Sequence, residues 1–419
     1  MPKNWKTYKL EEIALTNTST IGKDCNLNEI LYLDTGSVTE GRYDIPKSIS
    51  LSDAPSRAKR VVKNNDIIYS TVRPNQKHYG LIVNPKHNLI VSTGFCVISP
   101  IKVNPKFLYY YLTTDEMTNY LQTIAEGSTT TYPSIKPSVL EGIEINLPPL
   151  PEQKAIANII SAIDDKIENN LAINKTLEDM AMALYKHWFV EFGPFQDGEF
   201  IDSELGLIPK GWEVKRIGDL IEVINGFAFK SKWFQDHGEK VVKIKNISNN
   251  VVNINNCNCI SSNKALEVHE KFKISPGDFL IAMTGAEVGK TGVVPDYKES
   301  LWLNQRVGML KDKAFKNSSI LVGKILQSKE YYDIIQGLAY GSAQPNISSS
   351  GIENIEIILP IDFESIDDLI QEFVHTQDKI IHNLTENLTL TKLRNTLLPK
   401  LISGEVRLKE FREEAEQVV

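Results

Sequence analysis

The sequence is duplicated, and this internal repeat limits the folds open to the chain more than any other feature. The opening segment NWKTYKLEEI, which contains Trp5, returns 207 positions later as GWEVKRIGDL, which contains Trp212. The closing segment YPSIKPSVLEGIEINLP ends at Pro148, and its counterpart QPNISSSGIENIEIILP ends 212 positions later at Pro360. Two similar units on one chain can present two similar surfaces to one partner or to one pseudo-symmetric ligand.

A long helix is predicted after each repeat. Residues 152–192 contain neither Gly nor Pro, and apolar side chains recur there at heptad spacing. A weaker form of the same pattern follows the second repeat. The seam positions are Ile156, Ile160, Ile163, Ile167, Asn170, Asn174, Leu177, Ala181, Leu184 and Trp188, then Leu369, Phe373, Thr376, Ile380, Asn383, Asn387, Leu390, Arg394, Leu397 and Leu401. A forty-residue helix spans roughly 60 Å, so the second helix has to run back, antiparallel to the first.

Two asparagines occupy the middle of each seam: Asn170 and Asn174 in the first, Asn383 and Asn387 in the second. In an antiparallel pair they would meet one another. A buried Asn pair costs stability relative to leucine, but it penalises slipped registers that leave its amides unpaired. We predict that these four residues set the register; the alternative is a solvated asparagine on an ordinary two-helix linker.

Short strands such as DIIYSTV and GDFLIAM are mixed with helical stretches at Phe107–Tyr120 and Ile320–Ile335. Because strands and helices do not alternate regularly, an α+β fold is favoured over a doubly wound sheet. We predict two similar globular domains separated by an antiparallel two-helix coiled coil. The expected boundaries are residues 1–148 for the first domain, 149–192 for the first helix, 193–360 for the second domain with its leading linker, and 361–419 for the second helix and tail.

The overall charge of −7 hides a division between domains and helices. Residues 1–146 carry 16 Lys and Arg against 14 Asp and Glu, and residues 205–360 carry 19 against 16. Residues 147–204 carry 4 against 11, and residues 361–419 carry 7 against 12. The slightly basic domains are compatible with nucleic acid while the acidic helices repel phosphate, although two near-neutral domains with no such ligand fit equally well.

Loops rich in basic and amide side chains lie between the predicted strands of both domains. Arg, Lys, Asn and Gln suit base edges, and Ser, Thr and Lys suit phosphate oxygens. Any single loop of this kind is more often a solvated turn, but matched places in both repeats favour binding. The candidate DNA-binding residues are Arg57, Lys59, Arg60, Arg73, Asn75, Gln76, Lys77, His78, Tyr79, Ser128, Thr129, Thr130 and Tyr132, then Asn225, Phe227, Lys230, Lys245, Asn246, Thr284, Lys290, Asn304, Gln305, Arg306, Ser342 and Gln344.

No motif in the chain points to catalysis or to a bound metal. The segment TGAEVGKT at 284–291 has Thr284 where a phosphate-binding P-loop needs glycine, and no glycine-rich loop for S-adenosylmethionine follows a first strand. The cysteines lack the spacing of a zinc site, and the histidines are scattered. The pairs Asp164-Asp165 and Asp367-Asp368 are expected near helix N-termini, in a structural role. Without an apolar run of 18 residues or a signal-peptide pattern, a cytoplasmic location is the default expectation.

Several stretches resemble the specificity subunits of Type I restriction–modification systems. They are LPPLPEQKAIANIISAIDDKIENNLAINKTLEDMAMALYKHWFVEF at 147–192, NGFAFKS at 225–231, GDFLIAMTGAEVGKTG at 277–292, LNQRVGML at 303–310, YGSAQPNIS at 340–348 and LLPKLISGEVRL at 397–408. With the tandem layout, the resemblance extends over essentially the whole chain. The first domain follows the pattern less closely, as expected if the two domains read different bases.

The resemblance implies a non-catalytic subunit with two target-recognition domains, each reading one half of a bipartite sequence in double-stranded DNA. It implies that the helices bind two modification subunits, which carry S-adenosylmethionine and methylate adenine, and that motor-nuclease restriction subunits join for cleavage. ATP and Mg²⁺ would then also belong to partner subunits, with no cofactor or metal in this chain and no role for a membrane. Candidates for domain or partner docking are Trp188, Phe189, Phe192, Leu397, Leu398 and Leu401, with local packing as the equal alternative.

Our first hypothesis is therefore a DNA-specificity subunit in which the coiled coil sets the spacer between half-sites about one turn of DNA, roughly 34 Å, apart. A competing class is an enzyme, either a self-contained methyltransferase or a nuclease with divergent motifs. A third is a coiled-coil scaffold that binds only proteins, which a salt-dependent shift of duplex DNA would separate from the first.

Overall fold

The computed structural model describes residues 2–22, 27–127, 132–340 and 345–408. The chain divides into two compact units, one made of Met1–Lys166 with Leu390–Val419 and the other of Ile167–Thr389. Each unit contains one globular domain and one segment of each long helix. We call the globular parts domain 1 (residues 5–147) and domain 2 (residues 212–360); the four boundaries expected from the sequence stay predictions.

Two helices account for the predicted heptad segments: α5 spans Leu150–Tyr185 and α11 spans Asp367–Ser403. Within the second unit the Nδ2 of Asn170 donates to Oδ1 of Asn387 (2.8 Å), and the Nδ2 of Asn383 donates to Oδ1 of Asn174 (2.7 Å). The lower-numbered asparagine of α5 pairs with the higher-numbered asparagine of α11, and the reverse holds for the second pair. The two helices are therefore antiparallel there, as predicted. The α5 helix ends in a π-helical turn at Lys186–Val190.

The described residues of domain 1 form two four-stranded sheets, a two-stranded sheet and a small two-stranded hairpin. The first sheet has the order β2-β11-β8-β9 and the second the order β6-β3-β10-β7, in which β3 and β10 are parallel. The third pairs β1 with β12. The strands are β1 Lys6–Lys9, β2 Ala14–Thr16, β3 Glu29–Leu33, β6 Lys47–Ser50, β7 Ala58–Val61, β8 Ile67–Ser70, β9 Tyr79–Leu81, β10 Leu89–Ser92, β11 Phe95–Pro100 and β12 Glu144–Leu147, with a small hairpin of β4 Val38–Thr39 and β5 Arg42–Tyr43.

Domain 2 repeats this topology with extra edge strands. Its sheets have the orders β16-β26-β23-β24-β20-β19 and β17-β21-β18-β25-β22, and β15 pairs with β27. The strands are β15 Trp212–Arg216, β16 Ile221–Asn225, β17 Phe234–Gln235, β18 Glu239–Val242, β19 Ile247–Ser248, β20 Asn250–Val252, β21 Asn258–Ile260, β22 Lys273–Ile274, β23 Phe279–Ala282, β24 Thr291–Val293, β25 Leu301–Leu303, β26 Val307–Asp312 and β27 Glu356–Pro360; β13 Phe200–Ser203 and β14 Gly206–Pro209 form a hairpin before it.

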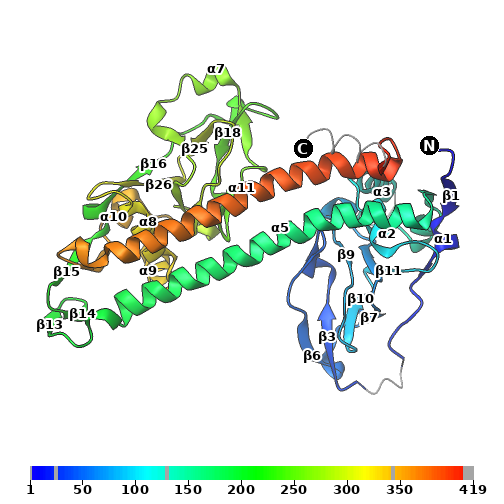
Figure 1. The fold of residues 1–419 in the computed structure, drawn as a ribbon, viewed down its shortest axis with the longest axis horizontal. Helices are drawn as coiled ribbons and strands as arrows, with labels where there is room; N and C mark the ends of the chain where they lie inside the picture. Colours follow the sequence, from blue (N-terminus) through cyan, green and yellow to red (C-terminus); the bar gives the residue numbers. More distant parts are fainter. Residues whose placement is uncertain (1, 23–26, 128–131, 341–344, 409–419) are drawn as a thin grey trace. The chain divides into compact units, whose positions relative to one another are not determined.

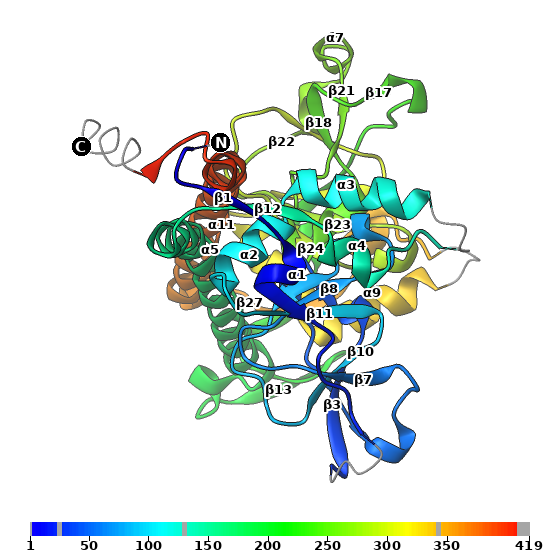
Figure 2. The same cartoon turned by 90° about the vertical axis from the view of Figure 1, so that its right-hand side faces the viewer.

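Both domains are layered in the same way, with helices on one side of the first sheet and the second sheet on the other (Figures 1 and 2). Strand β8 shows the reason, because its side chains alternate between two cores. Ile67 and Tyr69 pack with the helices, whereas Ile68 packs between the sheets. In β23, Phe279 and Leu280 divide in the same way. Because successive side chains of these strands point to opposite faces, one strand contributes to both cores.

The helical stretches expected at Phe107–Tyr120 and Ile320–Ile335 are each two helices. Domain 1 has α2 Pro105–Leu112 and α3 Asp115–Glu126, and domain 2 has α8 Ser318–Gln327 and α9 Lys329–Ala339. The breaks lie at Thr114 and Ser328, whose hydroxyls accept the backbone N–H three residues later and so begin a new helix. The remaining short helices are α1 Leu10–Ile13, α4 Pro137–Glu141, α6 Ile217–Leu220, α7 Ser262–Ala265 and α10 Ser349–Glu353.

The sequence led us to expect Asp164 near a helix N-terminus. It lies instead well inside α5. Its carboxylate binds Arg394 and Tyr110. Asp367 and Asp368 do lie in the first turn of α11. None of the described helices is both long and apolar enough to cross a membrane.

Candidate nucleic-acid interface

Four loops of domain 2 form one continuous cluster, held by backbone hydrogen bonds. Gln305 N–H donates to the carbonyl of Phe227 (2.9 Å), and Met283 N–H donates to that of Arg306 (3.0 Å). Ile347 N–H then donates to Met283 (2.9 Å), and Gly285 N–H to Pro345 (2.8 Å). We call residues 225–227, 283–285, 304–306 and 345–347 the domain 2 loop cluster. It brings together candidates that are widely separated in the sequence.

Gln305 and Arg306 are the exposed polar side chains at the centre of this cluster. Within the described residues, no hydrogen bond or ion pair engages the Arg306 guanidinium. Asn225 is exposed at the end of β16, and its Nδ2 donates to Oγ of Ser349 (3.2 Å). Lys230 and Lys245 are exposed as well, with Lys230 Nζ 5.8 Å from the centre of the Trp233 ring. A forked donor beside amide and ammonium groups is suited to base edges and phosphates.

Other domain 2 candidates are used inside the fold. Asn246 is 1% exposed; its Oδ1 accepts Lys243 N–H (2.9 Å) and its Nδ2 donates to Asn253 O (3.3 Å). Phe227 packs on Phe229, Trp233 and Phe272. Lys290 is paired with Glu287, and the Thr284 hydroxyl is buried. Asn304 is nearly buried, and its Oδ1 accepts Arg306 N–H (3.5 Å). We therefore leave Asn246, Phe227 and Lys290 out of the interface proposed below.

Domain 1 has an equivalent cluster in the same backbone arrangement. Arg73 N–H donates to Pro133 O (2.9 Å), and Thr71 N–H donates to Gly94 O (2.9 Å). We call residues 71–73, 92–94 and 132–135 the domain 1 loop cluster. Thr93 N–H donates to Arg57 O (2.8 Å), so Arg57 lies beside it. The bonds of Thr71 and Arg73 match those of Met283 and Gly285 at the repeat offset of 212.

Arg73 is the most distinctive side chain of this cluster. Its guanidinium carbon lies 4.7 Å from the centre of the exposed Tyr132 ring. Its backbone is left-handed (φ 49°), a conformation that L-residues rarely adopt and that is common at functional sites. Asn75 and Gln76 follow it, exposed, in a 3₁₀ turn. A stacked arginine is pre-organised, because fewer rotamers are lost when it binds.

The neighbouring residues Lys77, His78 and Tyr79 point to internal partners. Lys77 Nζ pairs with Asp115 (2.7 Å) and Glu40 (3.1 Å); burial lowers its pKa, but these hydrogen bonds and charges raise the pKa overall. The His78 ring bonds the carbonyl of Val38 (2.6 Å). Tyr79 is 6% exposed and stacks on Tyr69. These three residues shape the turn, and we leave them out of the proposed interface.

The segment with Arg57, Lys59 and Arg60 is not the loop expected from the sequence. Residues 58–61 form strand β7 at the edge of the second sheet. Arg57 and Lys59 are exposed, whereas Arg60 is half-buried and pairs with Thr20 through a β-bridge. An edge strand has only one side in the ladder, so polar side chains are tolerated there and mimic a loop in sequence. Arg57 alone contacts the cluster.

Sequence reasoning missed Ser92, Thr93 and Gly94, which lie in domain 1 where Asn304, Gln305 and Arg306 lie in domain 2. The repeat offset of 212 would have found them. The Oγ of Ser92 accepts Gly94 N–H (3.1 Å), the bond that Oδ1 of Asn304 makes with Arg306 N–H (3.5 Å). Five candidates, namely Ser128, Thr129, Thr130, Ser342 and Gln344, lie outside the described residues.

The asparagines and the docking candidates lie along the helices. Asn170, Asn174, Asn383 and Asn387 are all buried and pair as predicted, while their role in setting register stays a prediction. Phe189 and Phe192 pack on Trp212, with ring centres 5.6 and 5.3 Å away, and Trp188 packs on Phe195. In the first unit, Leu401 is buried in the core that contains Trp5, and Leu397 and Leu398 pack against it. Local packing therefore occupies much of their surface.

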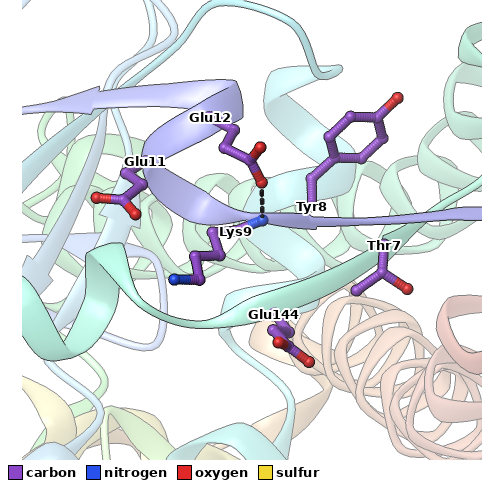
Figure 3. A pocket seen from close by; sticks show the side chains of 6 residues that line it. All are labelled: Thr7, Tyr8, Lys9, Glu11, Glu12 and Glu144. Atoms are coloured by element: carbon purple, nitrogen blue, oxygen red, sulfur yellow. Dashed lines mark hydrogen bonds between the residues drawn. The ribbon is translucent and has the colours of Figure 1, made fainter.

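The described residues form no metal-binding cluster, and one surface pocket lies outside both loop clusters. No group of three or more His, Cys, Asp or Glu side chains is placed to hold a metal ion there. A pocket at β1 and α1 is lined by Thr7, Tyr8, Lys9, Glu11, Glu12 and Glu144 (Figure 3). Lys9 N–H donates to Oε2 of Glu12 (2.6 Å), and the carboxylates of this pocket would repel phosphate. The pocket contains no residue of either loop cluster.

The family model for the Type I restriction modification DNA specificity domain matches the chain twice, at residues 2–179 and 209–392. Because these matches cover most of its length, the chain belongs to the family of Type I restriction–modification specificity subunits. The HindI specificity subunit of Haemophilus influenzae is 27% identical, covering 96% of this chain and 100% of that protein. The MjaIX specificity subunit of Methanocaldococcus jannaschii is 29% identical, covering 98% and 95%.

A solved structure supports the fold. The Type I restriction–modification S subunit from M. genitalium superposes with a TM-score of 0.56 at 18% identity, covering 95% of this chain and 96% of that one. The α+β domains and the antiparallel helices expected from the sequence are confirmed. As a specificity subunit, the chain recognises DNA sequence through two domains and is not itself the enzyme, since catalysis belongs to partner subunits.

Proposed function

We propose that the two loop clusters are the DNA-reading surfaces, and that each contacts one half of a bipartite target. The observation that carries this is their construction: one backbone arrangement, repeated at an offset of 212, presents different side chains in the two domains. Domain 1 offers Arg73, Asn75 and Gln76, and domain 2 offers Gln305 and Arg306. A shared scaffold with exchanged donors is what two different half-sites require.

Positioning on phosphate is assigned to exposed cations beside each cluster. In domain 1 these are Arg57 and Lys59, and in domain 2 they are Lys230 and Lys245. Ammonium groups neutralise phosphates without reading sequence, so their loss weakens binding to all DNA alike. The arginines of the clusters can instead donate two hydrogen bonds to one guanine, which carries sequence information.

The helices are proposed to bind two modification subunits, which would carry S-adenosylmethionine, with motor-nuclease subunits and their ATP and Mg²⁺ joining for cleavage in the cytoplasm. Support comes from the acidic helices, which do not favour DNA. A pocket in the second unit adds to this support: it is lined partly by Phe189 and Phe192 and by the exposed Val190, Leu205 and Leu207. Apolar side chains that remain exposed around a pocket are suited to a protein partner.

A matched lengthening of α5 and α11 tests whether the helix pair sets the spacer. One heptad inserted after Leu171 and one after Thr385 would add about 10.5 Å while keeping the seam in phase. Methylome sequencing of cells carrying the variant with its partner subunits should show unchanged half-sites and a spacer longer by about three base pairs, at about 34 Å per turn. The control carries the α5 heptad alone, which breaks the register. Altered half-sites with an unchanged spacer would contradict the proposal.

A further inference from the structure

The two places where a domain meets the helix pair are equivalent in the repeat but differ in charge. In the first unit, Asp164 of α5 is the centre of a small network. The Tyr110 hydroxyl donates to its Oδ2 (2.7 Å), and the Arg394 guanidinium of α11 donates to its Oδ1 (2.9 Å). Asp164 and Arg394 are each about one-third exposed or less. We call these three residues the first junction.

The second unit has different residues at the equivalent positions. At the helix offset of 213, Gln377 stands for Asp164 and Ala181 for Arg394; at the α2–α8 offset of 214, Lys324 stands for Tyr110. Gln377 is buried and donates to Gly277 O (3.0 Å). Lys324 is 2% exposed, and its Nζ contacts Oε1 of Gln327 (3.3 Å) and faces the Phe279 ring (5.7 Å).

Glu178 of α5 is the acidic group beside the buried Lys324. Burial lowers the pKa of Lys324, and the negative charge of Glu178 works against that lowering. The Glu178 carboxylate also accepts from Nδ2 of Asn250 (3.1 Å), which holds it against domain 2. We call Lys324, Glu178 and Gln377 the second junction. In α11 the residue equivalent to Glu178 is Thr391, which carries no charge.

Pairing of two α5 helices would disrupt the first junction, and pairing of two α11 helices would disrupt the second. If α5 paired with α5 of a second chain, Ala181 would take the place of Arg394, and Asp164 would lose its guanidinium partner. If α11 paired with another α11, Thr391 would take the place of Glu178, and buried Lys324 would lose the nearby negative charge. Removing the opposite charge from a charge that is partly shielded from water is destabilising, because the cost of its desolvation remains.

The central asparagines do not make this distinction. Asn170 is equivalent to Asn383 and Asn174 to Asn387, so an asparagine faces an asparagine whichever helices pair. They can align the helices without choosing between them. The choice of partner is left to the two junctions, where the repeat is broken by charge.

We propose that the two junctions form a charge code that makes the N-terminal half of the chain pair with a C-terminal half and not with a copy of itself. The partner recognised is an α11 that carries Arg394, whether in the same chain or in another. Such a code keeps two different DNA-reading domains in one molecule. It concerns how the halves join and does not rest on the proposed DNA contacts.

Two full-length chains with complementary charge reversals test the code. The first carries D164R and the second R394D, so like charges face each other at the first junction of each chain alone. When the two are expressed together with different affinity tags, opposite charges meet only if the chains exchange helices. We expect the second tag to co-purify with the first at least tenfold more than for two wild-type chains. The same two changes in one chain, D164R with R394D, should abolish this exchange.

The control reverses one charge of an ion pair that lies within a single helix, so an exchange of helices between two chains cannot restore it. Lys175 and Asp179 form an exposed pair within α5 (3.1 Å), so K175D and D179K chains should co-purify no more than wild type. If D164R or R394D is insoluble alone, recovery of soluble protein on co-expression supports the code. Monomeric, wild-type-like behaviour of both single variants together with no co-purification overturns it.

A second measurement covers the case in which no charge-reversed chain folds. D164N and R394Q neutralise the pair with little change in shape, and the unfolding equilibrium of each, and of both together, can be compared in the full chain. We expect the two changes together to cost at least threefold less in the unfolding constant than the product of the single costs. Costs that multiply without coupling would overturn the proposal.

Discussion

The two loop clusters differ mainly in where each carries its arginine. Domain 1 has Arg73 and Gly94, and domain 2 has Gly285 and Arg306 at the equivalent positions. The exchange is constrained by the backbone: a Cβ at Gly94 would lie 2.8 Å from Cγ2 of Thr35, whereas Gly285 keeps the left-handed turn (φ 75°) that Arg73 adopts under strain. The two clusters therefore present one arginine from different loops of a shared backbone arrangement.

Removal of the two arginines should have the largest effect and would test the comparison directly. Arg73→Ala should relax the half-site read by domain 1, and Arg306→Ala the other half-site, each by about 1–3 kcal/mol of base discrimination if the arginine binds a guanine. Methylome sequencing would show degeneracy at one or two positions of one half-site only. Degeneracy in the wrong half, or in neither, would contradict the assignment of these loops.

Lys77→Ala is the matched control for Arg73→Ala. It removes a positive charge from the same turn, but that charge is already paired with Glu40 and Asp115. The methylated motif should stay the same, because phosphate-level or structural contacts carry no sequence information. A changed motif in this control would mean that any disturbance of the turn alters reading.

The helix pair offers the second comparison, between its symmetric asparagines and its charged junctions. Asn174→Leu leaves Nδ2 of Asn383 without the acceptor that it has at 2.7 Å, which should cost about 1–3 kcal/mol of unfolding free energy. Asn174→Leu with Asn383→Leu should recover most of that loss, because both polar groups are gone. Urea unfolding of the three variants measures the coupling; a double variant as unstable as the two single effects added would exclude a specific pair.

How far the sequence predicted this structure depends on the kind of signal. The repeat and the heptads were enough for two like domains, two antiparallel helices and the meeting of Asn174 with Asn383, because periodicity reports directly on which face is buried. Loop composition was a poorer guide, since Asn246 and Asn225 look alike in sequence. Whether an amide caps its own backbone or faces solvent depends on the turn, which only coordinates reveal.

Two further errors have definable causes. Residues 92–94 were missed because Ser-Thr-Gly looks like an ordinary turn until it is aligned with the Asn-Gln-Arg of domain 2. Asp164 was assigned to a helix N-terminus, but its partners Tyr110 and Arg394 are far away in sequence. Contacts of this range leave no periodic trace, so the asymmetry of the two junctions could not be predicted from one sequence.

The smallest predicted effect concerns Lys324. This residue occupies the position at the second junction that Tyr110 occupies at the first. Burial lowers the pKa of Lys324 to about 8 from the usual 10.5, with Glu178 opposing the shift. Between these values the unfolded chain binds more protons than the folded one, so stability should rise as the pH rises through 8. From pH 7.5 to 9 the wild type should gain about 1 kcal/mol relative to Lys324→Met. Urea unfolding at several pH values measures this difference, in which contributions from other groups cancel. Curves that stay parallel would mean that Lys324 is not desolvated as the structure shows, and Glu178→Gln should move the rise to lower pH.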